Sequence, residues 1–196
     1  MDDTTENSST GAPDRTGRAA PLSPEDASEL VLDWAREQDL EADRLGDAHV
    51  AVTLPGDRKL KTTVSVRCSR RSIDLQAFVI RHPDENRERF QAWLLHKNSK
   101  LRGLAFSTDH LGDVYLDASL PVEAWSAEVL DSLLGRFLSA ADESFNDLLV
   151  LGFLTSMKKE WAWRISRGES TRNLAAFESL LSGPDNEFLD AGGSAD

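Results

Sequence analysis

The sequence has few of the residues that build metal sites and nucleophilic active sites. Cys68 is the only cysteine among 196 residues, so neither an internal disulfide nor a paired-cysteine zinc or redox site is available. No two of the four histidines are three or four residues apart, the spacing that places a metal-binding pair on one helix face. The glycine motifs of nucleophile elbows, P-loops and dinucleotide-binding turns are missing too. We therefore expect no enzymatic activity, no metal and no cofactor.

Long apolar runs and positive charge are also scarce. No apolar run approaches the roughly 20 residues of a membrane helix, and the N-terminus lacks the apolar stretch of a signal peptide. The 34 acidic residues outnumber the 22 lysines and arginines, which gives a formal net charge of −12. General nucleic-acid binding needs a basic surface that neutralises phosphates. The sequence thus predicts a cytoplasmic protein that binds neither membranes nor nucleic acid.

Composition divides the chain into one domain and two tails. Residues 1–21 are rich in Ser, Thr, Asp, Gly and Pro, with almost no large apolar side chains, so we expect a disordered N-terminal tail. Residues 181–196 have a similar, acidic composition and are predicted to form a disordered C-terminal tail. The segment 22–180 is long enough for a single domain with its own core.

The apolar periodicity of 22–180 predicts alternating blocks of helix and strand. A helix is expected over 24–39, with Ser23 as its N-cap, and a second helix from about 82–86. Strands are expected at 49–54, 58–67, 72–80, 102–109 and 113–119, and the chain from Trp125 onward has helical spacing with a break considered at 139–144. The order α-βββ-α-ββ-α(α) predicts an α+β fold in which helices pack on an antiparallel sheet.

The segment from Phe153 to Phe177 combines tryptophans with cations in an otherwise acidic chain. Trp161 and Trp163 are accompanied by Lys158, Lys159, Arg164, Arg167 and Arg172. Aromatic and arginine side chains are enriched where proteins bind one another.

Helical geometry separates the two tryptophans of this segment. On a helix Trp161 shares a face with Met157 and Ile165, whereas Trp163 points about 200° away. We expect Trp161 in the core. Trp163 is then either open to a partner or covered by Leu174, Phe177 and Leu180 folding back over it.

A second basic cluster, formed by Arg58, Lys59 and Lys61, lies at the start of a predicted strand. These cations could cover a solvated strand face or protect a sheet edge from aggregation. They could equally bind an anion or an acidic partner.

Four segments carry a family resemblance: LPGDRKLKTTVSV (54–66), FVIRHPDENRERFQAWLLHKN (78–98), GLAFSTDHLGDVYL (103–116) and FNDLLVLGFLTSMKKEWAWRISRGESTRNLAAF (145–177). Together they resemble the YbjN domain family of actinobacterial type, which is labelled a bacterial sensory transduction regulator. The PDEN, DHLGD and EWAWRxSRGE strings are its most specific parts. The resemblance covers about 45–177. It implies a fold similar to that of type III secretion chaperones and a binding or regulatory role without established catalytic residues. Because such chaperones are commonly dimers, a homodimer is one expected form.

Two functions remain open from the sequence. The first is a non-enzymatic regulator, adaptor or chaperone-like protein that binds another protein through its sheet face or the Trp/Arg segment, beside an apolar patch or groove. The alternative is a sensor that holds a small anion in a pocket where the cations converge. The candidate binding residues are Trp161, Trp163, Arg164, Arg167, Arg58, Lys59 and Lys61.

Overall fold

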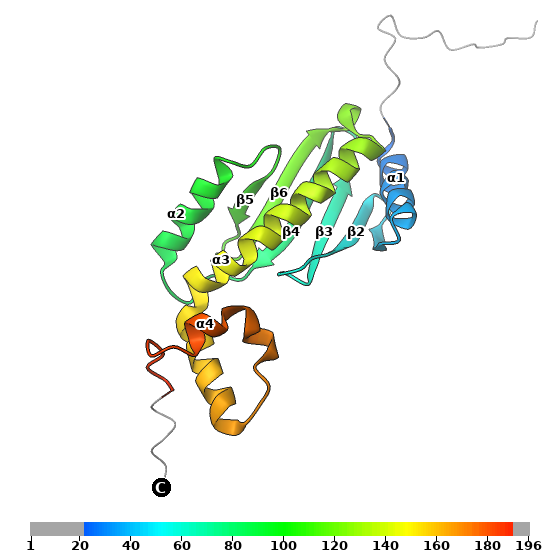
Figure 1. Cartoon of the computed structure of the whole chain (residues 1–196). Helices are drawn as coiled ribbons and strands as arrows, with labels where there is room; N and C mark the ends of the chain where they lie inside the picture. The colour runs from blue at the N-terminus through cyan, green and yellow to red at the C-terminus, as the bar shows by residue number, and fades with distance from the viewer. Residues whose placement is uncertain (1–21, 190–196) are drawn as a thin grey trace, which may run out of the picture.

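The computed structural model describes residues 22–189, which form a sheet with helices on one of its faces (Figure 1). The antiparallel sheet has the strand order β1-β2-β3-β4-β6-β5. Its strands are β1 (Glu41–Gly46), β2 (His49–Pro55), β3 (Lys61–Cys68), β4 (Ser72–Ile80), β5 (Ala105–Thr108) and β6 (Val114–Pro121). The helices that cover it are α1 (Pro24–Glu37), α2 (Arg87–Asn98) and α3 (Ala127–Arg167). The predicted α+β class is confirmed.

The prediction from apolar periodicity missed one strand. The observed order is α-ββββ-α-ββ-α, because β1 precedes the three strands that periodicity predicted. The six residues of β1, EADRLG, are almost all exposed, so no alternation of apolar and polar residues marks them. The strand is held instead by backbone pairing with β2 at the sheet edge, where charged side chains are common.

The core lies between the covered face of the sheet and the helices. Val50, Val52 and Leu54 of β2 alternate with partly exposed residues, and the same period-two pattern of burial continues in β3 and β4. Leu130, Leu134 and Phe137 of α3 are buried in the same core. The opposite face of the sheet carries no helix, which is why its side chains are mostly polar.

Helix α3 is longer than the sheet it covers. It runs through 41 residues, about 60 Å at the α-helical rise, starting at the N-cap Ser126 and ending at Gly168 with φ 65°. The break considered at 139–144 is absent, because Ala140, Ala141 and Ser144 are buried within one continuous helix. The second half of α3 therefore projects beyond the sheet and changes direction as it leaves it (Figure 1).

The chain beyond Gly168 returns along the projecting half of α3. The 3-10 helix η2 (Arg172–Phe177) and the short helix α4 (Glu178–Leu181) carry Leu174, Phe177 and Leu181 into contact with Met157 and Trp161. These five buried residues form a second, smaller core, separate from that of the sheet.

The described chain continues past the boundary that composition suggested for a C-terminal tail. Leu181 and Asn186 are buried, and the Asn186 amide donates hydrogen bonds to the carbonyls of Lys158 (3.3 Å) and Leu181 (2.7 Å). Residues 181–189 thus pack on α3. The tails expected at 1–21 and over 190–196 lie outside the described residues. Within 22–189, no helix has both the length and the apolar composition of a membrane span.

The single thiol provides a test of the sheet core. Cys68 ends β3 in a buried position, and burial raises the pKa of its thiol to about 11. Since the thiolate is the reactive form, we expect native Cys68 to react with Ellman's reagent at pH 8 at least about 100-fold more slowly than Cys68 in unfolded protein. Absorbance at 412 nm, recorded with and without 6 M guanidinium, measures this ratio. Equal rates in both solutions would contradict the buried placement.

Candidate functional site

The turn between β2 and β3 is fixed against α3. The carboxylate of Asp142 accepts hydrogen bonds from the backbone N–H groups of Arg58 (2.7 Å) and Lys59 (2.9 Å). Gly56 closes the turn by donating to the Leu60 carbonyl (3.2 Å). A Cβ atom at Gly56 would lie 2.5 Å from the Lys59 carbonyl oxygen, so only glycine fits there. These bonds hold the backbone that carries Arg58, Lys59 and Leu60 at a defined place beside α3.

A hollow of about 1030 Å³ lies between this turn, α3 and the returning C-terminal segment. It is lined by Asp57, Arg58, Lys59, Leu60, Lys61, Phe145, Arg164, Ser170, Arg172, Asn173 and Ala176. We call this hollow the cationic groove. One wall comes from the β2–β3 turn and the other from residues 164–176, which are about 100 positions later in the chain.

Five of the lining residues are cations and one is an acid. Within residues 22–189, no carboxylate lies within 4.0 Å of the charged groups of Arg58, Lys59 or Arg172. Lys61 is 3.7 Å from Glu41, and Arg164 pairs with a carboxylate of its own helix at 2.8 Å. The groove therefore has excess positive charge in a chain whose net charge is −12.

Lys59 is held by aromatic rings. Its Nζ lies 5.9 Å from the ring centroid of Phe78 and 5.7 Å from that of Phe145, and it donates a hydrogen bond to the Lys61 carbonyl (3.1 Å). Burial lowers the pKa of Lys59, whereas the ring faces attract its cation. Beside it the Leu60 side chain is 77% exposed, so the groove combines charge with accessible apolar surface.

The two tryptophans have different environments. Trp161 is buried in the second core at 5% exposure, whereas Trp163 is 47% exposed and neither of them lines the groove. The guanidinium of Arg167 lies 5.1 Å from the Trp163 ring centroid, a cation–π contact that leaves the ring partly exposed, and Arg167 also remains outside the groove. Ile165 is 53% exposed, and its predicted place beside Trp161 in the core is wrong.

The C-terminal segment folds back, but over the other tryptophan. Leu174 and Phe177 contact Trp161 and Met157, while Leu180 is exposed and Trp163 stays open. The helix face that carries Met157 and Trp161 extends beyond the sheet, so the returning chain is what buries it. Periodicity correctly placed Met157 and Trp161 on a buried face, but it did not identify the segment that covers this face.

The structure brings together the two basic clusters that the sequence treated separately. Arg58, Lys59, Lys61 and Arg164 all line the cationic groove. The prediction from sequence did not name Arg172 and Phe145, which line the groove, as candidate site residues. It also did not name Asp142, which fixes the β2–β3 turn. The acid at 142 gave no local signal, because its partners are backbone groups 84 and 83 positions away.

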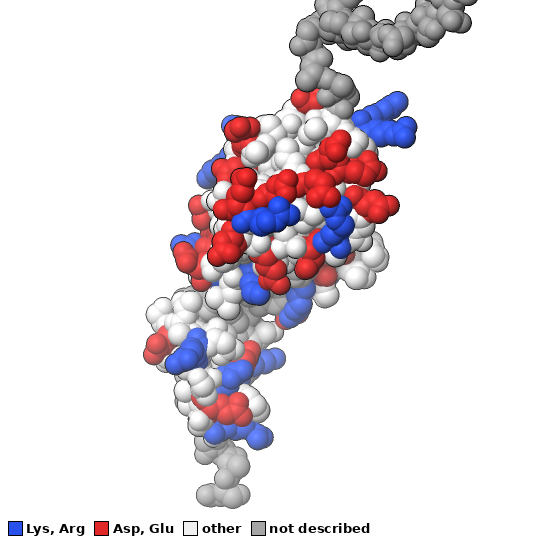
Figure 2. Space-filling view, turned by 90° about the vertical axis from the view of Figure 1, so that its right-hand side faces the viewer, with Lys and Arg blue, Asp and Glu red and all other residues white. Residues whose placement is uncertain are grey.

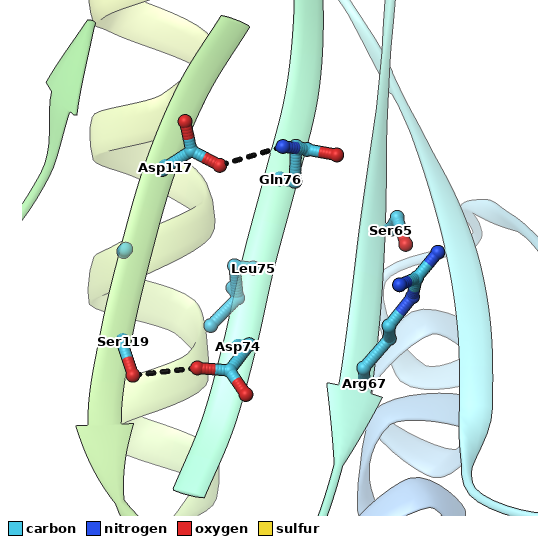
Figure 3. A pocket seen from close by; sticks show the side chains of 8 residues that line it. Ser65, Arg67, Asp74, Leu75, Gln76, Asp117 and Ser119 are labelled. Atoms are coloured by element: carbon cyan, nitrogen blue, oxygen red, sulfur yellow. Dashed lines mark hydrogen bonds between the residues drawn. The ribbon is translucent and has the colours of Figure 1, made fainter. Parts of the chain in front are cut away.

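A second hollow, of about 300 Å³, lies on the uncovered face of the sheet (Figure 3). Its carboxylates are already occupied: Ser119 donates to Asp74 at 2.6 Å, and Gln76 donates to Asp117 at 2.8 Å. Arg67 projects from β3 on the other side of the hollow (Figure 3). Because both of its carboxylates already accept hydrogen bonds, Arg67 is the one charged side chain of this lining that is not paired within residues 22–189.

Charge is unevenly distributed over the molecule. Figure 2 shows the side that carries α1, where acidic side chains predominate over the upper body. The exposed acids of α1 include Glu25, Asp26, Glu29, Asp33 and Glu37. Across residues 22–189, no three His, Cys, Asp or Glu side chains are grouped so as to hold a metal ion.

Comparison with known proteins identifies the family. A protein of Mycobacterium tuberculosis (strain H37Rv) is 46% identical over 129 residues, which cover 66% of this chain and 70% of that protein. A Mycobacterium leprae protein is 42% identical over 136 residues, covering 69% and 74%.

Solved structures that match this chain include a type III secretion chaperone. Yersinia pestis chaperone SycH, in complex with a stable fragment of YscM2, matches with TM-score 0.42 and 22% identity over 59% of this chain and 96% of that chain. The ExsC-ExsE complex matches with TM-score 0.46 and 19% identity, over 62% and 92%. The model of the family YbjN, "Putative bacterial sensory transduction regulator", matches residues 27–149, more than half of the sequence, so the chain belongs to the YbjN family.

Proposed function

We propose that this protein is a non-catalytic regulator or adaptor that binds another protein in the cationic groove. The observation that carries the proposal is the convergence of Arg58, Lys59 and Arg172, none neutralised by a carboxylate of residues 22–189, around a hollow with exposed apolar surface. Leaving such charges together costs free energy through mutual repulsion, which a bound anionic group would relieve.

A protein segment suits this groove better than a small anion. Small-ligand pockets are mostly apolar, measure about 300–1,000 Å³ and bury most of the ligand. The cationic groove, at about 1030 Å³, lies slightly above that range, and its lining combines five cations with exposed surface that is mostly apolar. Its cations are distributed over two walls, so an extended chain could contact both walls at once.

A small anion is the second candidate, because Arg58, Lys59 and Arg164 do line one hollow. Arg164 favours it less, since its guanidinium is already engaged by Glu160 (2.8 Å) and by the Ser170 carbonyl (2.9 Å). Arg167, the fourth cation expected for such a sensor, lies outside the lining.

Selection from a displayed library of random 12-residue peptides tests the proposal. Peptides recovered on the wild-type protein should bind it with micromolar Kd and bind the variant Arg58→Glu/Arg172→Glu at least about tenfold more weakly. Arg36→Glu is the matched control, because Arg36 is an exposed cation on α1, away from the groove.

The alternatives have distinct outcomes. Recovered peptides that bind both proteins equally would place protein binding elsewhere and overturn the proposal. A library that yields no binder, together with inorganic pyrophosphate binding that is lost in the double variant, would favour the small-anion sensor.

A further inference from the structure

Given the proposed function, on which this step rests, we infer that the cationic groove takes an acidic segment of its partner, with a large apolar side chain placed against Leu60 and Phe145. The charge of the lining sets the first requirement. Of its six ionisable side chains, five are cationic and only Asp57 is acidic. A basic segment would add to this repulsion, and a neutral one would leave the cations without counter-charges.

The position of the cations determines where the acidic residues of the partner segment must lie. Arg58 and Lys59 are on the turn between β2 and β3, while Arg172 is in η2 on the facing wall. Acids in the partner must therefore occur on both sides of its centre in order to meet both walls. Arg172 and Arg58 are exposed and accessible to carboxylates, which arginine can bind in bidentate fashion. Arg58 also donates one hydrogen bond to the Glu143 carbonyl (3.2 Å).

The apolar part of the lining sets the second requirement. Leu60 is the most exposed large apolar side chain among residues 22–189, and it adjoins Phe145 and Ala176 in the groove. Exposed leucine at the tip of a turn gains from burial when a partner covers it. Charge alone would make binding weak and unspecific, whereas an apolar anchor between cations adds specificity.

The acidic side chains of this chain that lie near the groove are already engaged by other groups. Asp142 lies beside the groove, but its carboxylate is used by the backbone N–H groups of Arg58 and Lys59. Glu160 and Glu169 pair with Arg164. Arg58, Lys59 and Arg172 are therefore left without a carboxylate partner among residues 22–189, which makes a separate acidic chain the complementary occupant.

Fluorescence anisotropy with labelled 12-residue peptides tests this inference. The probe alternates Glu and Asp around a central Leu-Phe pair. Three matched peptides replace its acids by Gln and Asn, replace its acids by Lys, or replace the central pair by two alanines. We expect the acidic-apolar probe to bind at least about tenfold more tightly than each of the other three, at 50 mM salt. Its affinity should fall at least about fivefold at 500 mM salt, because exposed charges are then screened.

Variants of the protein localise the binding. Arg58→Glu/Arg172→Glu should weaken probe binding about 30-fold or more, since the reversed charges repel the acids. Leu60→Ser should weaken it about tenfold through loss of the apolar contact. Arg167→Glu, at an exposed cation outside the groove, should change it less than about twofold. All four substituted residues are exposed, and an unchanged thermal midpoint verifies that each variant folds.

The outcomes separate this inference from the proposed function. If the neutral peptide binds as tightly as the acidic one and loses affinity in Leu60→Ser, the groove binds protein segments and the inference of an acidic ligand is overturned. If none of the four peptides binds in a groove-dependent way, and the library yields none either, both statements fail. Self-association that is abolished in the double variant, with no peptide binding, would identify a second copy as the occupant and also overturn the inference.

Discussion

Replacing Trp161 by alanine is expected to release the C-terminal segment from α3 while the sheet and its helices stay folded. Trp161 is the largest member of a core of five buried residues that holds residues 172–181 on the projecting half of α3. Tryptophan-to-alanine changes in cores cost about 3–5 kcal/mol. So small a cluster has little other burial to compensate. The main core shares no buried residue with it, and only the partly buried Leu149 packs against both, so the stability of the main core should change little.

Limited proteolysis with trypsin measures this release. Cleavage after Arg172 requires local opening of η2, and a loss of about 3 kcal/mol raises the open population about 100-fold. Trp163→Ala is the matched control: the same substitution two residues away removes an exposed ring and should leave the cleavage rate within about threefold of wild type. Equal cleavage of both variants, or global unfolding of Trp161→Ala, would contradict the existence of two cores. Because residues 164–176 form one wall of the cationic groove, Trp161→Ala should also weaken peptide binding.

The difference between these tryptophans shows what periodicity can and cannot predict. Helical spacing separated Trp161 from Trp163 correctly, because backbone geometry alone decides which residues share a face. It could not say what covers that face. The same spacing placed Ile165 in the core, but Ile165 lies in the last turn of α3, where neither the sheet nor η2 reaches it.

The groove was only partly predictable, for a related reason. Both of its basic clusters were recognised from local composition, and both were candidates for binding. Their meeting depends on the length of α3, about 60 Å, and on the reversal of the chain at Gly168. Those features bring residues 164–176 to the turn at 57–61, and no local pattern encodes a contact across 100 positions. The strand β1 was missed because its side chains face solvent and only its backbone pairs.

The PDEN string was also explained incorrectly from the sequence. Asp84 and Glu85 were interpreted as the start of the second helix, but α2 begins at Arg87, after Asn86 in a left-handed conformation with φ 53°. Instead, the N–H groups of Asp84 and Glu85 donate to the Gly152 carbonyl at 3.0 and 3.2 Å. The amide of Asn86 donates to the Leu151 carbonyl at 3.1 Å. These bonds are made to carbonyl groups in the middle of α3.

Glu85 completes this contact, which we call the α3 joint (residues 84–86 with 151–156). Its carboxylate accepts from the backbone N–H and from the hydroxyl of Thr155, both at 2.7 Å. In a regular helix that N–H would donate to the Leu151 carbonyl. In the α3 joint, residues 84–86, which lie outside α3, take the place of some of these helical hydrogen-bond partners. Insertion of side chains into the hydrogen-bond ladder bends helices. The joint lies where α3 leaves the sheet and changes direction (Figure 1). We therefore expect the PDEN string to influence the direction of the groove wall carried by the rest of α3.

Glu85→Ala is therefore expected to loosen the α3 joint. The substitution removes two charge-assisted hydrogen bonds, which contribute about 1.5–3 kcal/mol each, and leaves the Thr155 groups to find other partners. Hydrogen exchange followed by mass spectrometry should show faster exchange at residues 151–156, with the sheet strands unaffected. Glu85→Gln keeps one acceptor oxygen and should restore part of the protection, and Glu88→Ala, at an exposed acid three residues away, should behave as wild type.

The Glu85→Ala variant also tests whether the position of the groove wall, and not only direct contact with its side chains, affects peptide binding. Glu85 does not line the cationic groove, so any loss of peptide affinity in Glu85→Ala must come from movement of the wall that Arg164 and Arg172 carry. We expect such a loss, about tenfold, with the salt dependence of the remaining binding reduced because fewer cations meet the peptide. Full affinity combined with fast exchange at 151–156 would show that the groove does not depend on the bend in α3. In that case the PDEN string would serve stability alone.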